Sequence, residues 1–139
     1  MKLIPYLTFN GNCEEALSFY KTVFDGKTEI MRFKEMPPSE EVPVNDAWGD
    51  KVMHASLKFG EELMIYCSDI FEGGSVSSGD NVTVHLDVDS EEEVNRFFSG
   101  LSEGGTVTMP VEKMFWGAVY GSLTDRFGIN WGFNYSIEA

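Results

Sequence analysis

Two histidines, His54 and His85, are the side chains of this sequence best suited to acid–base or metal chemistry near neutral pH. Each lies in a run of alternating apolar and polar residues, which is typical of a β-strand. Neither belongs to a close-spaced ligand motif such as His-x-x-x-His or Cys-x-x-Cys. A third metal ligand would have to be Asp87, Glu112 or a cysteine, so we expect no native metal and no other cofactor.

Catalysis without a metal needs a general base and a group that polarises the substrate. His54 or His85 is a candidate base. Glu112 is a candidate acid if Phe115 and Trp116 bury it and raise its pKa. The alternative is that both histidines only form hydrogen bonds with their neighbours, and the sequence does not decide whether any reaction is catalysed.

The two cysteines, Cys13 and Cys67, do not suggest a disulfide framework and fit a reducing, cytoplasmic environment. Cys13 falls in the first turn of a predicted helix, where a thiolate would be stabilised. It also belongs to the apolar stripe of that helix. We therefore expect Cys13 to pack against a sheet.

Two amphipathic helices are predicted where apolar residues recur at helical spacing. The first begins at Asn12 and ends at Gly26, and the second begins at Asp89 or Ser90 and ends before Gly104. A glutamate three residues after each start is typical of a capping box. The two helices match each other at an offset of 77 residues, as in Leu17 and Val94.

Strand-like runs flank both helices in the same order, which predicts a β-α-β-β-β unit that occurs twice. The runs are residues 3–9, 28–33, 52–59 and 63–67, then 81–88, 106–111, 115–123 and 129–135. We expect one α+β domain, residues 1–139, with module 1 at about 1–69, a linker at about 70–80 and module 2 at about 81–139. The alternative is that the two short amphipathic helices match by coincidence and the chain contains no repeat.

The long irregular segment 34–50 is predicted to be a lid, an interface loop or an ordinary solvent-exposed loop.

One side of several predicted strands is polar without being strongly charged, which suits a partly enclosed cleft better than open water. The alternative is that these polar strand sides form a sheet face that is open to solvent. Flat rings with a few polar groups suit a small organic ligand, and acidic surroundings favour a cationic or neutral one. The expected ligand-binding residues are His54, Ser56, Tyr66, Thr83, His85, Trp116, Tyr120 and Asn130.

The charge balance excludes several classes of partner. The sequence has 23 acidic against 10 basic side chains and a formal net charge of -13. Such a surface repels nucleic acids and anionic membranes, and no apolar run approaches the ~20 residues that span a bilayer. We therefore expect a cytoplasmic protein whose partner is a small organic molecule.

Three segments carry a resemblance to a known family: PYLTFNGNCEEALSFYKTVF, KVMHASLKFG and SEGGTVTMPVEKMFWGAVYGSLTDRFGINW. They resemble the PhnB-like group of the vicinal oxygen chelate superfamily, which also contains glyoxalase I, bleomycin-resistance proteins and extradiol dioxygenases. The pattern FWG…YG…TDRFG…W is fairly specific to the group. The resemblance covers nearly the whole chain and implies two βαβββ modules whose curved, mixed sheets enclose a cleft, usually in a homodimer.

The resemblance also implies where a metal would bind. Glyoxalase-like members hold a divalent metal with four ligands on four strands, and these positions fall here on Pro5, Met64 or Tyr66, Thr83 and Gly132. None of these is a good ligand, because proline and glycine have no side-chain donor and threonine and tyrosine bind such metals poorly. Metal chemistry is therefore not expected at these positions.

Members of the group are sometimes labelled as ubiquinone-precursor methyltransferases. This sequence has no glycine-rich strand-to-helix turn of the G-x-G type that would hold a nucleotide-like cofactor. The first hypothesis is therefore a metal-independent protein that binds a small molecule. The alternatives are a lyase or isomerase that uses His54 and His85 with a non-standard metal site, and a resistance-type protein that sequesters a cationic drug.

Overall fold

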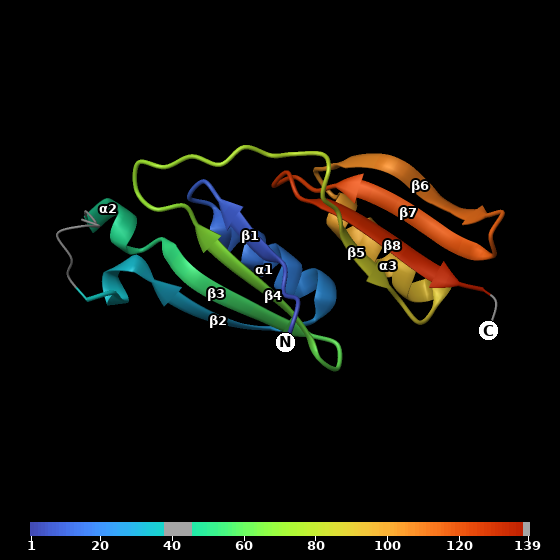
Figure 1. Cartoon of the computed structure of the whole chain (residues 1–139), viewed down its shortest axis with the longest axis horizontal. Helices are drawn as coiled ribbons and strands as arrows, with labels where there is room; N and C mark the ends of the chain where they lie inside the picture. Colours follow the sequence, from blue (N-terminus) through green and yellow to red (C-terminus); the bar gives the residue numbers. More distant parts are fainter. Residues whose placement is uncertain (38–45, 138–139) are drawn as a thin grey trace. The chain divides into compact units, whose positions relative to one another are not determined.

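The computed structural model describes residues 1–37 and 46–137 of the chain. It divides into two compact units, Met1–Ser77 and Ser78–Ala139, and the boundary lies inside the predicted linker. Each unit contains one long helix and a four-stranded sheet (Figure 1). The predicted α+β class with two βαβββ modules is therefore confirmed. Residues 38–45 of the predicted loop 34–50 lie outside the described residues.

Module 1 is a mixed sheet with its helix against one face. Its main elements are β1 (Tyr6–Phe9), α1 (Cys13–Phe24), β2 (Lys27–Arg32), β3 (Val52–Phe59) and β4 (Leu63–Asp69). The strand order is β1-β4-β3-β2; β1 runs parallel to β4, and the other neighbours are antiparallel. A 3-10 turn, η1 (Phe33–Glu35), follows β2, and a short helix, α2 (Asp46–Gly49), precedes β3.

Module 2 repeats this arrangement. Its elements are β5 (Val84–Asp87), α3 (Glu91–Ser102), β6 (Thr106–Met114), β7 (Ala118–Thr124) and β8 (Asn130–Ser136). The strand order is β5-β8-β7-β6, and the first and last strands of the module are again parallel. The two modules are therefore a tandem repeat at the level of strand pairing as well as element order.

The buried faces of the two long helices correspond at the predicted offset of 77, since Leu17, Tyr20 and Phe24 match Val94, Phe97 and Leu101. Only the helix starts are 78 residues apart, because the residue that caps α3 is Ser90 and not Asp89. The Ser90 hydroxyl accepts a hydrogen bond from the Glu93 N–H at 3.1 Å, so the helix begins one residue later.

The core of each module lies between the helix and one face of the sheet. In module 1, α1 and β3 contribute apolar side chains that are almost fully buried, among them Leu17, Tyr20 and Leu57. In module 2, α3 packs Val94 and Leu101 against the same kind of face. Burying each such side chain contributes roughly 1.5–3 kcal/mol, so the helix-covered faces supply most of the stabilisation. The opposite face of each sheet, which no helix of its own module covers, is called its open face below.

The start of α1 differs from the capping box that the sequence predicts. The Asn12 side chain makes no capping hydrogen bond. Asp69, at the end of β4 and only 3% exposed, takes this role. Its Oδ1 accepts from the N–H groups of Gly11 and Cys13, and its Oδ2 accepts from Val52 N–H, each at 2.9 Å. One buried carboxylate therefore joins α1, β3 and β4.

Candidate ligand-binding faces

The open face of module 1 carries an aromatic and histidine cluster, defined here as Tyr6, His54 and Tyr66. Strand register places Tyr66 opposite both Tyr6 and Ser56, so these side chains share one face. The Tyr6 hydroxyl and His54 Nδ1 are 3.0 Å apart. The Tyr66 ring lies edge-on to His54, with ring centroids at 4.8 Å. Two phenols and an imidazole therefore form one contiguous, partly exposed surface.

Tyr6 was not among the residues expected to bind a ligand. It is 50% exposed, although it lies at the start of a strand whose next residue, Leu7, is buried. The alternation of β1 alone would have placed Tyr6 on the open face.

The open face of module 2 carries a second cluster, defined here as Thr83, His85, Asp87 and Tyr120. Its centre is Gly132, which lies opposite His85 in the parallel register of β5 and β8. His85 Nε2 is 2.9 Å from Asp87 Oδ1. The His85 and Tyr120 rings are stacked, with centroids 6.2 Å apart and planes 19° apart. The other atoms near Gly132 belong to Thr83 and Tyr120.

Six of the eight expected ligand-binding residues therefore lie in or beside one of the two clusters: His54, Ser56, Tyr66, Thr83, His85 and Tyr120. The structure brings them together within each module. Their role as ligand contacts stays a prediction, and so does the expectation that both faces share one cleft.

Trp116 is placed differently from the prediction, whereas Asn130 lies on its predicted strand with hydrogen-bond partners in its own module. Trp116 lies in the turn between β6 and β7, and not on a strand, because pairing of this hairpin ends at Met114 and Ala118. The Asn130 amide is occupied by internal contacts. Its Nδ2 donates to the carbonyls of Gly79 and Val82, and its Oδ1 accepts from Thr124. Asn130 therefore ties the segment before β5 to β8.

The conditions for Glu112 to act as a buried acid are not met. Glu112 is exposed on β6. The aromatic residues expected to cover it are themselves exposed, Phe115 at 98% and Trp116 at 54%. The prediction failed because these rings lie in a turn and pack against each other, with centroids at 5.0 Å. Glu112 instead lines an open depression of about 400 Å³ beside Glu91 and Lys113.

The positions at which the resemblance implies a metal do not form a ligand set. Among the described residues, no group of three or more histidine, cysteine, aspartate or glutamate side chains has the arrangement needed to hold a metal ion. Pro5 contributes only its backbone carbonyl, which accepts from Tyr66 N–H at 2.9 Å. Gly132 has no side-chain donor. The side chains at these four positions therefore do not fit a divalent metal.

The two cysteines lie together in the core of module 1. Both are fully buried and both are free thiols. The hydrogen bond with Cys67 and burial raise the pKa of the Cys13 thiol far above its ordinary range. The thiol is therefore protonated at neutral pH, and Cys13 packs against the sheet as the sequence predicts.

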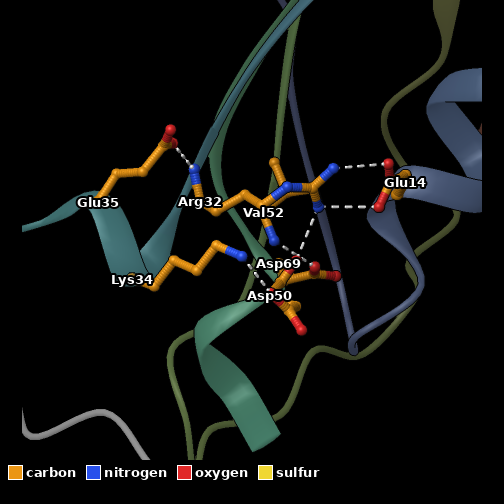
Figure 2. Close-up of polar contacts among 7 residues, drawn as sticks. All are labelled: Glu14, Arg32, Lys34, Glu35, Asp50, Val52 and Asp69. Carbon is orange, nitrogen blue, oxygen red and sulfur yellow. Dashed lines mark hydrogen bonds and ion pairs between the residues drawn. The ribbon is translucent and has the colours of Figure 1, made fainter. Parts of the chain in front are cut away.

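A charged network surrounds the start of α1 (Figure 2). The Arg32 guanidinium donates two parallel hydrogen bonds of 2.9 Å to the Glu14 carboxylate, and a third to the Asp50 carbonyl. Lys34 pairs with Asp50 at 2.7 Å. The Arg32 hydrogen bond lowers the pKa of Glu14, and Lys34 lowers the pKa of Asp50. The network borders an open cavity of about 330 Å³ lined by Glu14, Asp50 and Asp69 among others.

Comparison with known proteins identifies the family. The model of the 3-demethylubiquinone-9 3-methyltransferase family matches residues 1–133. This chain belongs to that family. The chain is 32% identical to the Escherichia coli protein YjdN over 96% of this chain and 95% of that protein. It is 38% identical to the crystal structure of PA1353 from Pseudomonas aeruginosa, with a TM-score of 0.83 and 98% of each chain covered.

More distant structures place this family within a larger fold group. A PhnB protein from Bacillus cereus, described as a putative 3-demethylubiquinone-9 3-methyltransferase, is 24% identical with a TM-score of 0.75 over 98% of this chain and 100% of that one. A glyoxylase/bleomycin resistance protein/dioxygenase domain from Frankia sp. EAN1pec is 14% identical, with a TM-score of 0.71. The match covers 100% of this chain and 93% of that one. At these identities the comparison shows the fold alone. The resemblance is therefore confirmed for the family, by the family model, and for the fold, by these structures.

The family description names methyl transfer, which requires a methyl donor. Doubly wound α/β folds hold a nucleotide-like cofactor at a helix N-terminus, so the starts of the two long helices are the positions to compare. At α1, the N–H groups of Gly11 and Cys13 already donate to Asp69. At α3, Ser90 caps the helix and three glutamates occupy its first turn. These described residues do not fit such a cofactor, and we derive no methyl-transfer step.

No helix of the described residues is long and apolar enough to cross a membrane.

Proposed function

We propose that this protein binds a small organic molecule on the open faces of its sheets, without a metal. The observation that carries the proposal is the pair of histidine and tyrosine clusters. Each combines a ring surface with several hydrogen-bonding atoms on a face that no helix of its own module covers. Binding sites for small molecules typically have this mixture of aromatic walls and few polar groups.

The chemistry of the clusters favours a planar ligand that is neutral or cationic. Tyr66 and Tyr120 offer ring faces and edges, while His54, His85 and Ser56 offer hydrogen bonds. The net charge of -13 raises the local concentration of cations and repels strongly anionic molecules. The lyase or isomerase alternative would need a non-standard metal site, for which the described residues supply no set of ligands. No observation favours drug sequestration over other binding roles.

A melting-temperature screen against a library of small aromatic and cationic compounds tests the proposal. A compound present at 100 times its Kd stabilises the folded protein by ~2.7 kcal/mol, which corresponds to roughly 5–10 °C for a chain of this size. We expect at least one compound to raise the Tm of the wild type. The same compound should act less on His54→Ala or His85→Ala.

Lys21→Ala is the matched control, because Lys21 is exposed on α1, on the helix-covered side of its own sheet. Its response to the compound should equal that of the wild type. A library that raises the Tm of no sample, or raises the Tm of all four proteins equally, would overturn the proposal.

A further inference from the structure

We infer that the module 2 cluster binds a weakly acidic hydroxyl, as in a phenol or an enol, with His85 Nδ1 as the acceptor of its proton. This inference rests on the proposed function and names the ligand class for one of its two faces. It follows from two features of the cluster: the hydrogen bond that fixes His85, and the convergence of polar atoms over Gly132.

The first feature sets which ring nitrogen of His85 is free to accept. Nε2 lies 2.9 Å from Asp87 Oδ1. A carboxylate can only accept a hydrogen bond, so the proton of the neutral imidazole must be on Nε2. Nδ1 then carries a lone pair. The same carboxylate stabilises the positive charge that develops on the ring when a proton moves toward Nδ1, as in other carboxylate–histidine pairs.

The second feature is the position of Nδ1. A Cβ placed on Gly132 would lie 3.1 Å from His85 Nδ1 and 3.4 Å from the Tyr120 hydroxyl. Nδ1 and this hydroxyl therefore border the same small space above Gly132. The Thr83 methyl, also at 3.4 Å, adds an apolar contact. An acceptor and a donor that close together match a hydroxyl, which donates to Nδ1 and accepts from Tyr120.

The backbone conformation at position 132 does not explain why this residue is a glycine. Gly132 is not among the glycines with positive φ, so other residues could adopt its conformation. A Cβ there would crowd His85 Nδ1 and would reach van der Waals contact with Tyr120 and Thr83. We assign to Gly132 the role of letting His85 and Tyr120 lie close to the sheet in one arrangement. His85 remains 44% exposed at its side chain and accessible to a ligand.

Module 1 provides a contrast within the same chain. There the partner of His54 is the Tyr6 hydroxyl, which contacts Nδ1 at 3.0 Å. A phenol hydroxyl can donate to Nδ1 or accept from it, so this contact does not fix the tautomer of His54 as a carboxylate fixes that of His85. Only His85 is therefore assigned to an acidic hydroxyl.

The test compares two probes that differ in a single proton donor, 4-nitrophenol and its methyl ether 4-nitroanisole. Binding is followed by NMR on isotope-labelled full-length protein. We expect 4-nitrophenol to bind about tenfold more tightly, because one hydrogen bond contributes roughly 1–1.5 kcal/mol. Gly132→Ala should remove this preference. Gly79→Ala, a glycine in the linker with no crowded neighbour, should retain it.

Asp87 is a positioning residue, so its test reads the tautomer directly. Long-range proton–nitrogen spectra distinguish the two ring nitrogens of His85. We expect protonation at Nε2 in the wild type, a mixture of tautomers in Asp87→Ala, and no change in the control Asp89→Ala. A purely structural role for Asp87 would leave the tautomer unchanged.

The outcomes separate this inference from the proposed function. Equal affinity for both probes, or an Nδ1-protonated His85 in the wild type, overturns the inference, while the proposed function stands. Failure of 4-nitrophenol to bind when other compounds raise the Tm also overturns only the inference. Absence of any ligand in the melting screen overturns the proposed function as well.

Discussion

At the scale of single residues, one buried aspartate in each module accepts several hydrogen bonds from neighbouring segments. Neither role was predicted from the sequence. Asp69 holds the start of α1 against β3 and β4. Asp125, only 4% exposed, accepts from the N–H groups of Phe127 and Ile129 and from the Trp131 indole. Each accepts hydrogen bonds from three N–H donors that are buried or partly buried. Such residues keep the strands that carry the clusters in register.

Replacing Asp69 tests this role. Asp69→Ala leaves three N–H groups without their acceptor, and we expect a loss of about 3–4 kcal/mol in the free energy of unfolding. Urea denaturation measures the loss. Asp80→Ala, an exposed aspartate of the linker, should change the free energy by less than ~0.5 kcal/mol. An equal, small effect in both variants would contradict the role given to Asp69.

The cysteines make a second prediction at this scale. Burial and the Cys67 contact raise the pKa of Cys13, so neither a reactive thiolate nor an exposed sulfur is present in the folded protein. We expect an aromatic disulfide reagent to modify neither cysteine of the native protein and both cysteines in denaturant. Rapid modification of the native protein would show that this part of the core opens.

At the scale of elements, periodicity was enough to predict the fold. All eight expected strands and both long helices are present, because alternation and helical spacing report directly on which face is buried. Contacts between distant segments could not be predicted. The cap on α1 comes from Asp69, 56 residues away from Cys13. The position of Trp116 depends on where the pairing of a hairpin ends, which apolar content does not specify.

For the candidate binding residues too, periodicity predicts the strand face but not the contacts between side chains. Alternation correctly put His54, Ser56 and His85 on polar strand faces, whereas Thr83 lies just before β5. It could not reveal that Asp87 orients His85, or that the Asn130 amide is occupied by the linker. These depend on side-chain rotamers and on chain connections that a spacing pattern does not contain.

The ion pair between α1 and β2 predicts a pH dependence. Arg32 lowers the folded-state pKa of Glu14 below that of the unfolded chain. Stability from this pair is therefore present above the unfolded pKa and is lost as pH falls through the lower folded value. Both side chains are partly exposed, so we expect Glu14→Gln to cost less than ~1 kcal/mol at pH 7.

The measurement is urea denaturation of Glu14→Gln and wild type between pH 7 and pH 2. The difference between the two proteins should shrink toward zero at the acid end. Glu15→Gln, the next glutamate of the same helical turn, is the control and should show no comparable trend. A difference that stays constant with pH would mean that the ion pair does not stabilise the fold.

At the scale of the whole molecule, large apolar side chains remain exposed in the described chain. Phe115 and Trp116 are more than half exposed and contact each other, with ring centroids 5.0 Å apart. Exposed apolar side chains of this size are often covered by a partner when they form a contiguous patch. We expect two copies of the chain to associate. Light scattering with size exclusion should give twice the mass of one chain, and a monomer at micromolar concentration would contradict the expectation.

The most direct test of the central claim, that the open faces bind a small organic molecule, is NMR shift mapping with the most stabilising compound from the melting screen. Two-dimensional spectra report every backbone amide and both histidine rings at once. We predict that the largest shifts fall on the clusters around Tyr6, His54 and Tyr66 or around His85 and Tyr120. Shifts confined to the helices, or spread evenly over the chain, would contradict it.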